Sequence, residues 1–223
     1  MKPDTKFDVI VCGAGHAGVE SALILNQLGV HTAIVTIDPL AIGRMSCNPA
    51  IGGLAKGQIV KEIDVLGGIM PSAADHSALQ YKILNQSKGK SVWSPRAQVD
   101  KRRYEAFISN AVSGAENLTI IKGEVVNLEI QNNTVVGAVL RDGKSIKCKS
   151  VILTCGTFLN GLVHVGQKKI RAGRMGENPA QGITESLLSL GFKSGRLKTG
   201  TPPRLDAATI NWDKMSLAPG DGE

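Results

Sequence analysis

Aromatic residues are scarce in this chain of 223 residues, at 4%, and cysteine occurs only four times. Cys12, Cys47, Cys148 and Cys155 form no C-x-x-C pair or other metal-ligand spacing, so we expect no metal site. No apolar run approaches the ~20 residues of a membrane-spanning helix, and residues 1–7 lack the apolar core of a secretory signal. These absences predict free thiols, a reducing, cytoplasmic location and no membrane contact.

Glycine and basic residues are, by contrast, abundant. Many of the 26 glycines cluster, at 13–18, 52–57 and 67–68, a pattern typical of backbone that approaches a ligand closely. The 26 Lys and Arg residues outnumber the 19 Asp and Glu residues, which gives a net charge of +7. That balance favours an anionic partner, although a soluble protein without such a partner can be equally basic.

The first 37 residues have the pattern of a β–α–β unit. Residues 7–13 (FDVIVCG) are a short apolar run that ends in glycine and predicts a buried parallel strand. Residues 16–28 carry apolar positions at helical spacing, and Gly29 then ends the helix. Residues 31–37 are rich in β-branched side chains and predict the second strand.

The turn between that first strand and the helix reads GAGHAG, which matches G-x-G-x-x-G. Gly13 permits the tight turn, Gly15 lets a pyrophosphate approach the backbone, and Gly18 lets helix and strand pack closely. The helix N-terminus adds amide donors and the positive end of its dipole. The predicted dinucleotide-binding residues are Gly13, Ala14, Gly15, His16, Ala17 and Gly18. Thr36 stands where a ribose-binding acid is usual, and Asp38 follows two residues later.

Further elements follow along the chain. We expect a loop at 38–57, a helix at 58–66, irregular polar chain at 71–98, helices at 100–112 and 180–190, and a rigid turn at 199–204. Three β-rich runs at 119–130, 134–141 and 145–154 are separated by Asn-Asn and Asp-Gly turn signals, so they predict an antiparallel meander. In two-dinucleotide flavoproteins such a meander returns to a strand whose glycine turn lies beside the flavin. Gly156 fits that turn, and the combination favours FAD over NAD.

The loop around Cys47 is the most unusual stretch, because residues 46–68 combine a cysteine, Asn-Pro and several glycines where a flavin ring is expected. A thiolate at Cys47 is a possible nucleophile, and an inert thiol is the alternative. Two basic stretches, at 82–104 and 164–179, are expected to lie on either side of the flavin site, and Trp93 lies in the first. Basic side chains together with an aromatic side chain suit the phosphate backbone and a stacked base of a nucleic acid. The alternative interpretation is a solvated basic surface with no such partner.

Several of these segments together resemble the glucose-inhibited division protein A family of tRNA uridine 5-carboxymethylaminomethyl modification enzymes. They are GAGHAG, SCNPAIGGLAKGQIVKEIDVLGG, LNQSKGKSVWSPRAQVDK, GTFLNGLVHVGQ and GRLKTGTPPR. The resemblance covers nearly the whole chain. It implies an FAD enzyme that acts on the wobble uridine of tRNA with a GTPase partner, a methylene folate, glycine or ammonium, and NADH. It also implies a homodimer longer than this chain, so we expect an N-terminal fragment that is inactive alone.

The resemblance also implies roles for single residues. Residues 13–18 bind FAD, Val125 contacts the adenine end through its backbone, and Ala180 occupies a further FAD position that is often serine in relatives. Cys47 matches a cysteine implicated in catalysis. The candidate tRNA-binding residues are Lys56, Lys88, Arg96, Arg102, Arg103, Arg171, Arg174 and Arg204.

The fold expected from these observations is α/β. It is a Rossmann-like FAD-binding fold of the two-dinucleotide flavoprotein type, with an antiparallel β meander at 119–150 and inserted basic loops. Residues 1–223 form the N-terminal part of that domain, 160–223 begin an inserted or second subdomain, and the fold is incomplete at its C-terminus. Two other functions stay open: a flavin oxidoreductase acting on a small molecule, and a non-catalytic RNA-binding module.

Overall fold

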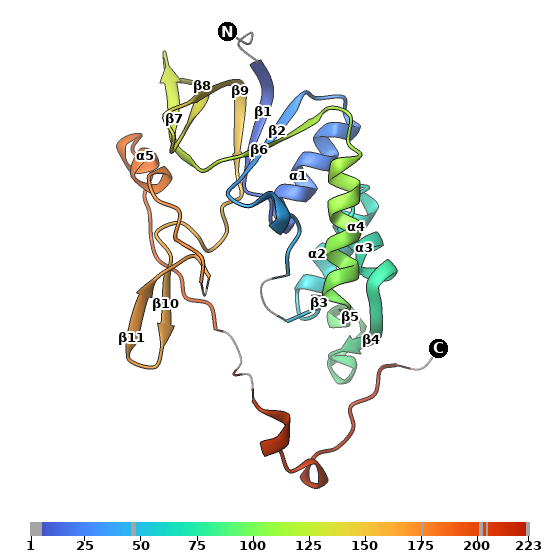
Figure 1. Cartoon of the computed structure of the whole chain (residues 1–223). Helices are drawn as coiled ribbons and strands as arrows, with labels where there is room; N and C mark the ends of the chain where they lie inside the picture. The colour runs from blue at the N-terminus through green and yellow to red at the C-terminus, as the bar shows by residue number, and fades with distance from the viewer. Residues whose placement is uncertain (1–5, 46–47, 175, 201–202, 204, 222–223) are drawn as a thin grey trace.

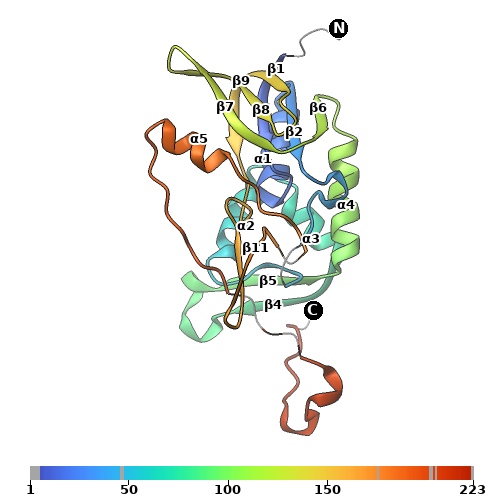
Figure 2. The same cartoon turned by 60° about the vertical axis from the view of Figure 1, so that its left-hand side comes forward.

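The computed structural model describes residues 6–45, 48–174, 176–200, 203 and 205–221. A six-stranded mixed sheet lies at one end of the molecule and a three-stranded antiparallel sheet at the other, with helices alongside (Figure 1 and Figure 2). The helices are α1 (His16–Gln27), α2 (Lys56–Val65), α3 (Met70–Ser77), α4 (Lys101–Ser113) and α5 (Ile183–Ser189).

The six-stranded sheet has the order β6-β2-β1-β9-β8-β7. Its strands are β1 (Lys6–Cys12), β2 (Thr32–Thr36), β6 (Leu118–Lys122), β7 (Val125–Gln131), β8 (Thr134–Leu140) and β9 (Ser145–Leu153). β6, β2, β1 and β9 are parallel neighbours, whereas β7, β8 and β9 pair antiparallel. α1 connects β1 to β2, so the predicted β–α–β unit and the Rossmann-like α/β class are confirmed.

The side chains of β1 and β2 alternate between two hydrophobic cores. On one face, Val11 and Ile34 pack with α1 and α4, where Tyr104 is fully buried. On the other face, Ile10 and Val35 pack with β8 and α5. Burial on both faces explains why these strands read as continuous apolar runs rather than as alternating patterns.

The predicted antiparallel meander is formed by β7, β8 and β9, but its first strand is shorter than expected. Residues 119–130 form two strands, because the chain changes partner at Gly123, whose N–H donates to the Thr36 carbonyl oxygen over 2.9 Å. β6 is a parallel edge strand beside β2, so the prediction of one meander strand there was wrong. The two predicted turns are confirmed, since Asn132, Asn133 and Gly143 all have positive φ.

The stretch at 71–98 is regular, which corrects the expectation of irregular chain. It contains most of α3, then β4 (Ala78–Leu84) and β5 (Ser94–Val99). β5 lies between β4 and β3 (Ala50–Gly52) and pairs with both, so the order is β3-β5-β4. Leu79, Tyr81 and Ile83 alternate with Gln80 and Lys82 along β4, a strand pattern that the expectation of irregular chain overlooked, and Leu79 and Tyr81 are exposed. β4 pairs with β5 along its length, so its alternating pattern and its pairing agree.

The segment predicted as a second basic loop contains a hairpin, β10 (Leu162–Val165) and β11 (Lys168–Arg171). Its turn passes through Gly166 at φ +57°. α5 is confirmed but shorter than the helix predicted at 180–190. In the rigid turn predicted at 199–204, Thr201, Pro202 and Arg204 lie outside the described residues.

A late segment, 218–221, lies along the outer edge of β4. Asp221 donates its backbone N–H to the Tyr81 carbonyl oxygen (2.9 Å), and its carboxylate accepts from Ile83 N (2.6 Å). Lys82 Nζ donates to the Pro219 carbonyl oxygen over 3.0 Å. This part of the chain therefore extends the hydrogen bonding of the three-stranded sheet.

Three further observations concern thiols, metal ligands and membrane-spanning helices. Cys12, Cys148 and Cys155 are free thiols. Over the ranges that the structure describes, no group of three His, Cys, Asp or Glu side chains is placed to hold a metal ion. Within those same ranges, no helix has the length and apolar character needed to cross a membrane.

Candidate functional site

Two glycines of the turn between β1 and α1 are required by packing. Gly13 has φ +108°, which side chains rarely tolerate, and a Cβ there would lie 2.7 Å from the carbonyl oxygen of Thr154. A Cβ on Gly18 would overlap the carbonyl oxygen of Gly13. These contacts match the steric roles that the G-x-G-x-x-G pattern predicts for its first and last glycines.

Gly15 is different, because a Cβ there would have no neighbouring atom within 4 Å. It is the N-cap of α1, and the first helical hydrogen bond runs from Val19 N to Gly15 O over 2.9 Å. The N–H groups of residues 15–18 thus have no acceptor within the helix, and the first turn holds no acidic residue. Open space, free amides and the positive end of the helix dipole fit a pyrophosphate.

The carboxyl end of β9 closes the other side of the turn. Thr154 N donates to Cys12 O over 2.9 Å, and the Thr154 hydroxyl lies 2.9 Å from Cys12 O and 3.1 Å from Gly13 O. Gly156 follows at φ +59°, exposed and with open space around it. Two open glycines, Gly15 and Gly156, therefore lie at the same edge of the sheet.

The end of β2 carries the expected ribose position. The Thr36 carbonyl oxygen accepts from Gly123 N, which brings the start of β7 and the buried Val125 to this strand end. The Thr36 hydroxyl donates to Asp38 O over 3.3 Å. The Asp38 carboxylate accepts a backbone N–H two residues on (3.0 Å) and pairs with Arg44 (3.5 Å). Asp38 is therefore engaged locally, unlike a ribose-binding acid.

Ala180 joins the segment after Gly156. Its N–H donates to Phe158 O and its carbonyl oxygen accepts from Asn160 N, both over 2.9 Å. The next residue, Gln181, donates its N–H to the Glu124 carboxylate over 3.0 Å. Hydrogen bonds thus connect the segments that carry the described candidate cofactor positions beyond the glycine turn. These positions are Thr36, Val125, Gly156 and Ala180.

The Glu124–Arg141 pair stabilises this link. Arg141 donates Nε and Nη2 to the two Glu124 oxygens (2.5 and 2.6 Å), and this hydrogen bonding is the main cause that lowers the pKa of the carboxyl below its ordinary value of 4.5. A lowered pKa contributes stability that is present above about pH 4.5 and lost as the pH falls through the folded-state value. We expect Glu124→Gln to lower the free energy of unfolding at pH 7 by about 1–2 kcal/mol, and to have little effect at a pH well below 4.

Urea denaturation at both pH values measures this difference. Glu116→Gln is the matched control, since Glu116 is exposed and has no ion pair with the described residues. Equal stability of Glu124→Gln and the parent chain at pH 7 would contradict the prediction, as would a penalty that is unchanged in acid.

Burial favours the neutral forms of His16 and of the described cysteines. Burial lowers the pKa of His16, whose Nδ1 lies 3.5 Å from the Tyr104 hydroxyl. Burial raises the pKa of the thiols of Cys12, Cys148 and Cys155. This agrees with structural rather than reactive roles for those three cysteines.

The predicted catalytic residue, Cys47, lies outside the described residues. The chain that leads to it is fixed at two points. Gly43 N donates to Ala14 O over 2.9 Å, and Met45 N donates to the Glu105 carboxylate over 3.2 Å. The segment before Cys47 is therefore hydrogen-bonded to the glycine turn at Ala14.

The predicted tRNA-binding residues lie on separate elements. The exposed ones are Lys56, Lys88, Arg102, Arg103 and Arg171. Arg96 is half-buried on β5, and its buried Nε has no hydrogen-bond partner among the described residues. Arg174 pairs with Glu177 (3.0 Å), and its guanidinium lies 5.3 Å from the Phe158 ring centroid. Arg204 lies outside the described residues.

Sequence reasoning missed three structural contributors: Thr154, Arg44 and the Glu124–Arg141 pair. Arg44 contacts both Asp38 (3.5 Å) and Glu177 (3.6 Å). None of them belongs to a motif, and a hydroxyl residue after an apolar strand is too common to be a signal.

Comparisons with known proteins agree with one another. The family model described as glucose inhibited division protein A matches residues 8–223. Two curated relatives are each called tRNA uridine 5-carboxymethylaminomethyl modification enzyme MnmG. The one from Sulfurihydrogenibium sp. is 49% identical over 99% of this chain and 36% of its own length. The one from Flavobacterium psychrophilum is 50% identical over 97% and 35%.

Solved structures are also similar. That of Aquifex aeolicus GidA has a TM-score of 0.92 at 47% identity, over 99% of this chain and 36% of that one. A GidA-related protein from Thermus thermophilus shares the fold, with a TM-score of 0.61 at 22% identity over 84% of this chain and 69% of its own. The chain spans about a third of the length of the curated relatives it matches.

Proposed function

The chain belongs to the glucose-inhibited division protein A family, and from that premise we propose that it is the FAD-binding portion of a tRNA-modifying enzyme. The reaction proposed for the whole protein adds a carboxymethylaminomethyl group to the wobble uridine. The relatives are named as tRNA uridine 5-carboxymethylaminomethyl modification enzymes, which supports this substrate and reaction. The chain spans only 35–36% of those relatives, so the reaction is proposed for the whole protein.

The observation that carries the FAD proposal is the open space over Gly15 at the start of α1. The residues proposed to hold the pyrophosphate are 13–18, through their backbone amides. Thr36 and Val125 are proposed at the adenosine end, and Gly156 and Ala180 toward the flavin. When bound, FAD supplies reversible redox chemistry.

The chain's own residues bind and orient. Thr154 fixes the Gly13 carbonyl, so it positions the turn rather than touching the ligand. Cys47 is proposed as the catalytic residue, whose thiolate adds to the uracil ring or transfers a proton. NADH, a methylene folate, a GTPase partner, homodimerisation and a cytoplasmic location are proposed for the whole protein on the family premise.

Titration of the chain with FAD tests the proposal directly. We expect saturable binding, seen as a shifted flavin absorbance spectrum and a raised melting temperature. Absence of FAD binding would contradict the proposed cofactor. Binding of FAD by a full-length protein that has no salt-sensitive affinity for tRNA would favour a flavin oxidoreductase for small molecules.

The basic side chains at the start of α4 are proposed to contact tRNA phosphates. Arg102 and Arg103 are exposed, and Asp100, the N-cap, accepts their backbone N–H groups rather than their guanidinium groups. We expect Arg102→Ala and Arg103→Ala to weaken tRNA binding by the full-length protein, and each to reduce the slope of log K against log salt by about 0.7–0.9.

A salt series of filter-binding measurements gives both quantities. Lys122→Ala, which removes an exposed cation from β6 at the far edge of the six-stranded sheet, is the matched control and should leave the slope unchanged. Parental affinity and slope in both arginine variants would remove this surface from the proposal.

A further inference from the structure

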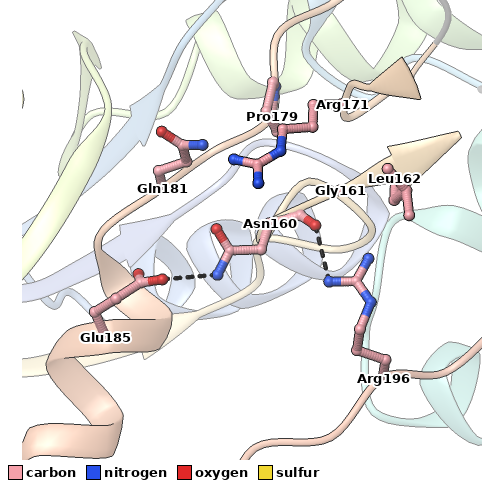
Figure 3. Close-up of a pocket in the computed structure, with 8 residues that line it drawn as sticks. All are labelled: Asn160, Gly161, Leu162, Arg171, Pro179, Gln181, Glu185 and Arg196. Atoms are coloured by element: carbon pink, nitrogen blue, oxygen red, sulfur yellow. Dashed lines mark hydrogen bonds between the residues drawn. The ribbon is translucent and has the colours of Figure 1, made fainter. Parts of the chain in front are cut away.

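A cavity of about 390 Å³ lies between the segment after Gly156, the end of β11 and α5 (Figure 3). Most of its lining side chains are polar, and two of them are arginines, Arg171 and Arg196. Its size is within the range of small-ligand sites, toward the lower end. No residue of the cavity except Arg171 has a role in the proposed function.

One wall of the cavity is held in place by hydrogen bonds. Arg196 Nη1 donates to the Asn160 carbonyl oxygen over 3.0 Å, and Asn160 Nδ2 donates to Glu185 over 2.9 Å. Glu185 also accepts the backbone N–H of Gly182 over 2.9 Å. Glu185, the single carboxylate of the lining, is therefore engaged by donors of its own wall. The positive charges of Arg171 and Arg196 thus outnumber the one negative charge of the lining.

The opposite side of the cavity has unused donors. Among the described residues, the side chains of Arg171 and Gln181 have no hydrogen-bond or ion-pair partner. Figure 3 shows both side chains pointing toward one another above Asn160. Arg196 keeps the remaining N–H groups of its fork, since only Nη1 is engaged. Guanidinium forks and an amide that converge on one space match the geometry of an oxyanion.

Charge outside the cavity favours the same ligand. β11 ends at Arg171, and the earlier residues of that strand, including Lys168 and Lys169, are exposed. An anion that approaches along the hairpin thus meets positive charge before it reaches the cavity.

We propose that this cavity binds a phosphate group between Arg171 and Arg196. The phosphate has two chemical sources: a free phosphate ion or compound, and a phosphodiester of RNA that lies along the β10–β11 hairpin. The RNA source rests on the proposed function, whereas the free phosphate source does not.

Isothermal titration of the 223-residue chain with inorganic phosphate, and fluorescence anisotropy with a single-stranded oligouridylate, separate the two sources. The variants are Arg171→Gln, which breaks no hydrogen bond to the described residues, and Arg196→Gln. Lys168→Gln is the control, because it removes the same charge from the same hairpin outside the cavity. FAD titration of each variant reports on the proposed function separately.

A free-phosphate site predicts saturable phosphate binding that is weakened at least about tenfold in Arg171→Gln and Arg196→Gln and is retained in Lys168→Gln. An RNA site predicts no measurable phosphate binding, but oligouridylate binding at least about fivefold weaker in the two cavity variants and less than about twofold weaker in the control. Equal effects in all three variants, or no binding of either probe by the parent chain, would overturn the proposal. If the parent chain binds phosphate but not FAD, the proposed function fails and the phosphate site stands.

Discussion

Gly15→Glu should abolish detectable FAD binding, with affinity at least about 100-fold lower, while the chain stays folded. The added carboxylate enters the space where the pyrophosphate is proposed, so it opposes that ligand by both volume and charge. The fold should tolerate it, because Gly15 has an ordinary φ of −73° and no neighbouring atom within 4 Å of a Cβ. Gly15→Ala should cause a smaller loss, about tenfold.

Flavin fluorescence quenching measures the affinity, and circular dichroism checks the fold. Gly195→Glu is the matched control, since Gly195 also has open space around its Cβ position and receives the same charge. Its FAD affinity should equal that of the parent chain. An unchanged affinity in Gly15→Glu would remove the pyrophosphate from this turn.

Gly18→Ala should destabilise the chain by about 3 kcal/mol, in the upper part of the range for an overpacked core. Helix propensity alone predicts the opposite sign, since alanine is favoured over glycine by about 1 kcal/mol in a helix. The Cβ would overlap the backbone carbonyl oxygen of Gly13 and would approach the Thr154 hydroxyl, at 2.8 Å. The Gly13 oxygen belongs to the backbone of the turn, so it cannot move aside as the end of a flexible side chain can.

Chemical denaturation without FAD measures this effect apart from cofactor binding. Gly114→Ala is the control: it ends α4 with helical backbone angles, and its Cβ would meet only an ordinary contact at 3.4 Å. It should be neutral or slightly stabilising. Stability of Gly18→Ala equal to that of the parent chain would mean that helix and strand separate easily, against the close packing described here.

The glycine turn was predictable because its sequence signal is local, although the atoms that a Cβ on Gly13 would meet belong to Thr154, 141 residues away. Gly13 and Gly18 are needed by atoms of the turn itself and of the strand beside it, and the G-x-G-x-x-G spacing encodes that geometry directly. The Asn-Asn turn before β8 was predictable for the same reason, as both residues accept positive φ.

The parts that sequence reasoning missed depend on partners far along the chain. β6 separates from β7 because β2 accepts it as a neighbour. At the site, the Thr154 hydroxyl bonds to Gly13 from 141 residues away. No local pattern carries such information, so these features follow from the tertiary structure alone.

The contact of residues 218–221 with β4 also bears on self-association. An edge strand with free backbone groups is a template for strands of other copies, and exposed apolar side chains such as Leu79 and Tyr81 increase that hazard. On this edge, Tyr81 O and Ile83 N are both occupied by Asp221. The late segment therefore occupies backbone groups through which this edge would otherwise be free to pair with a strand of another copy.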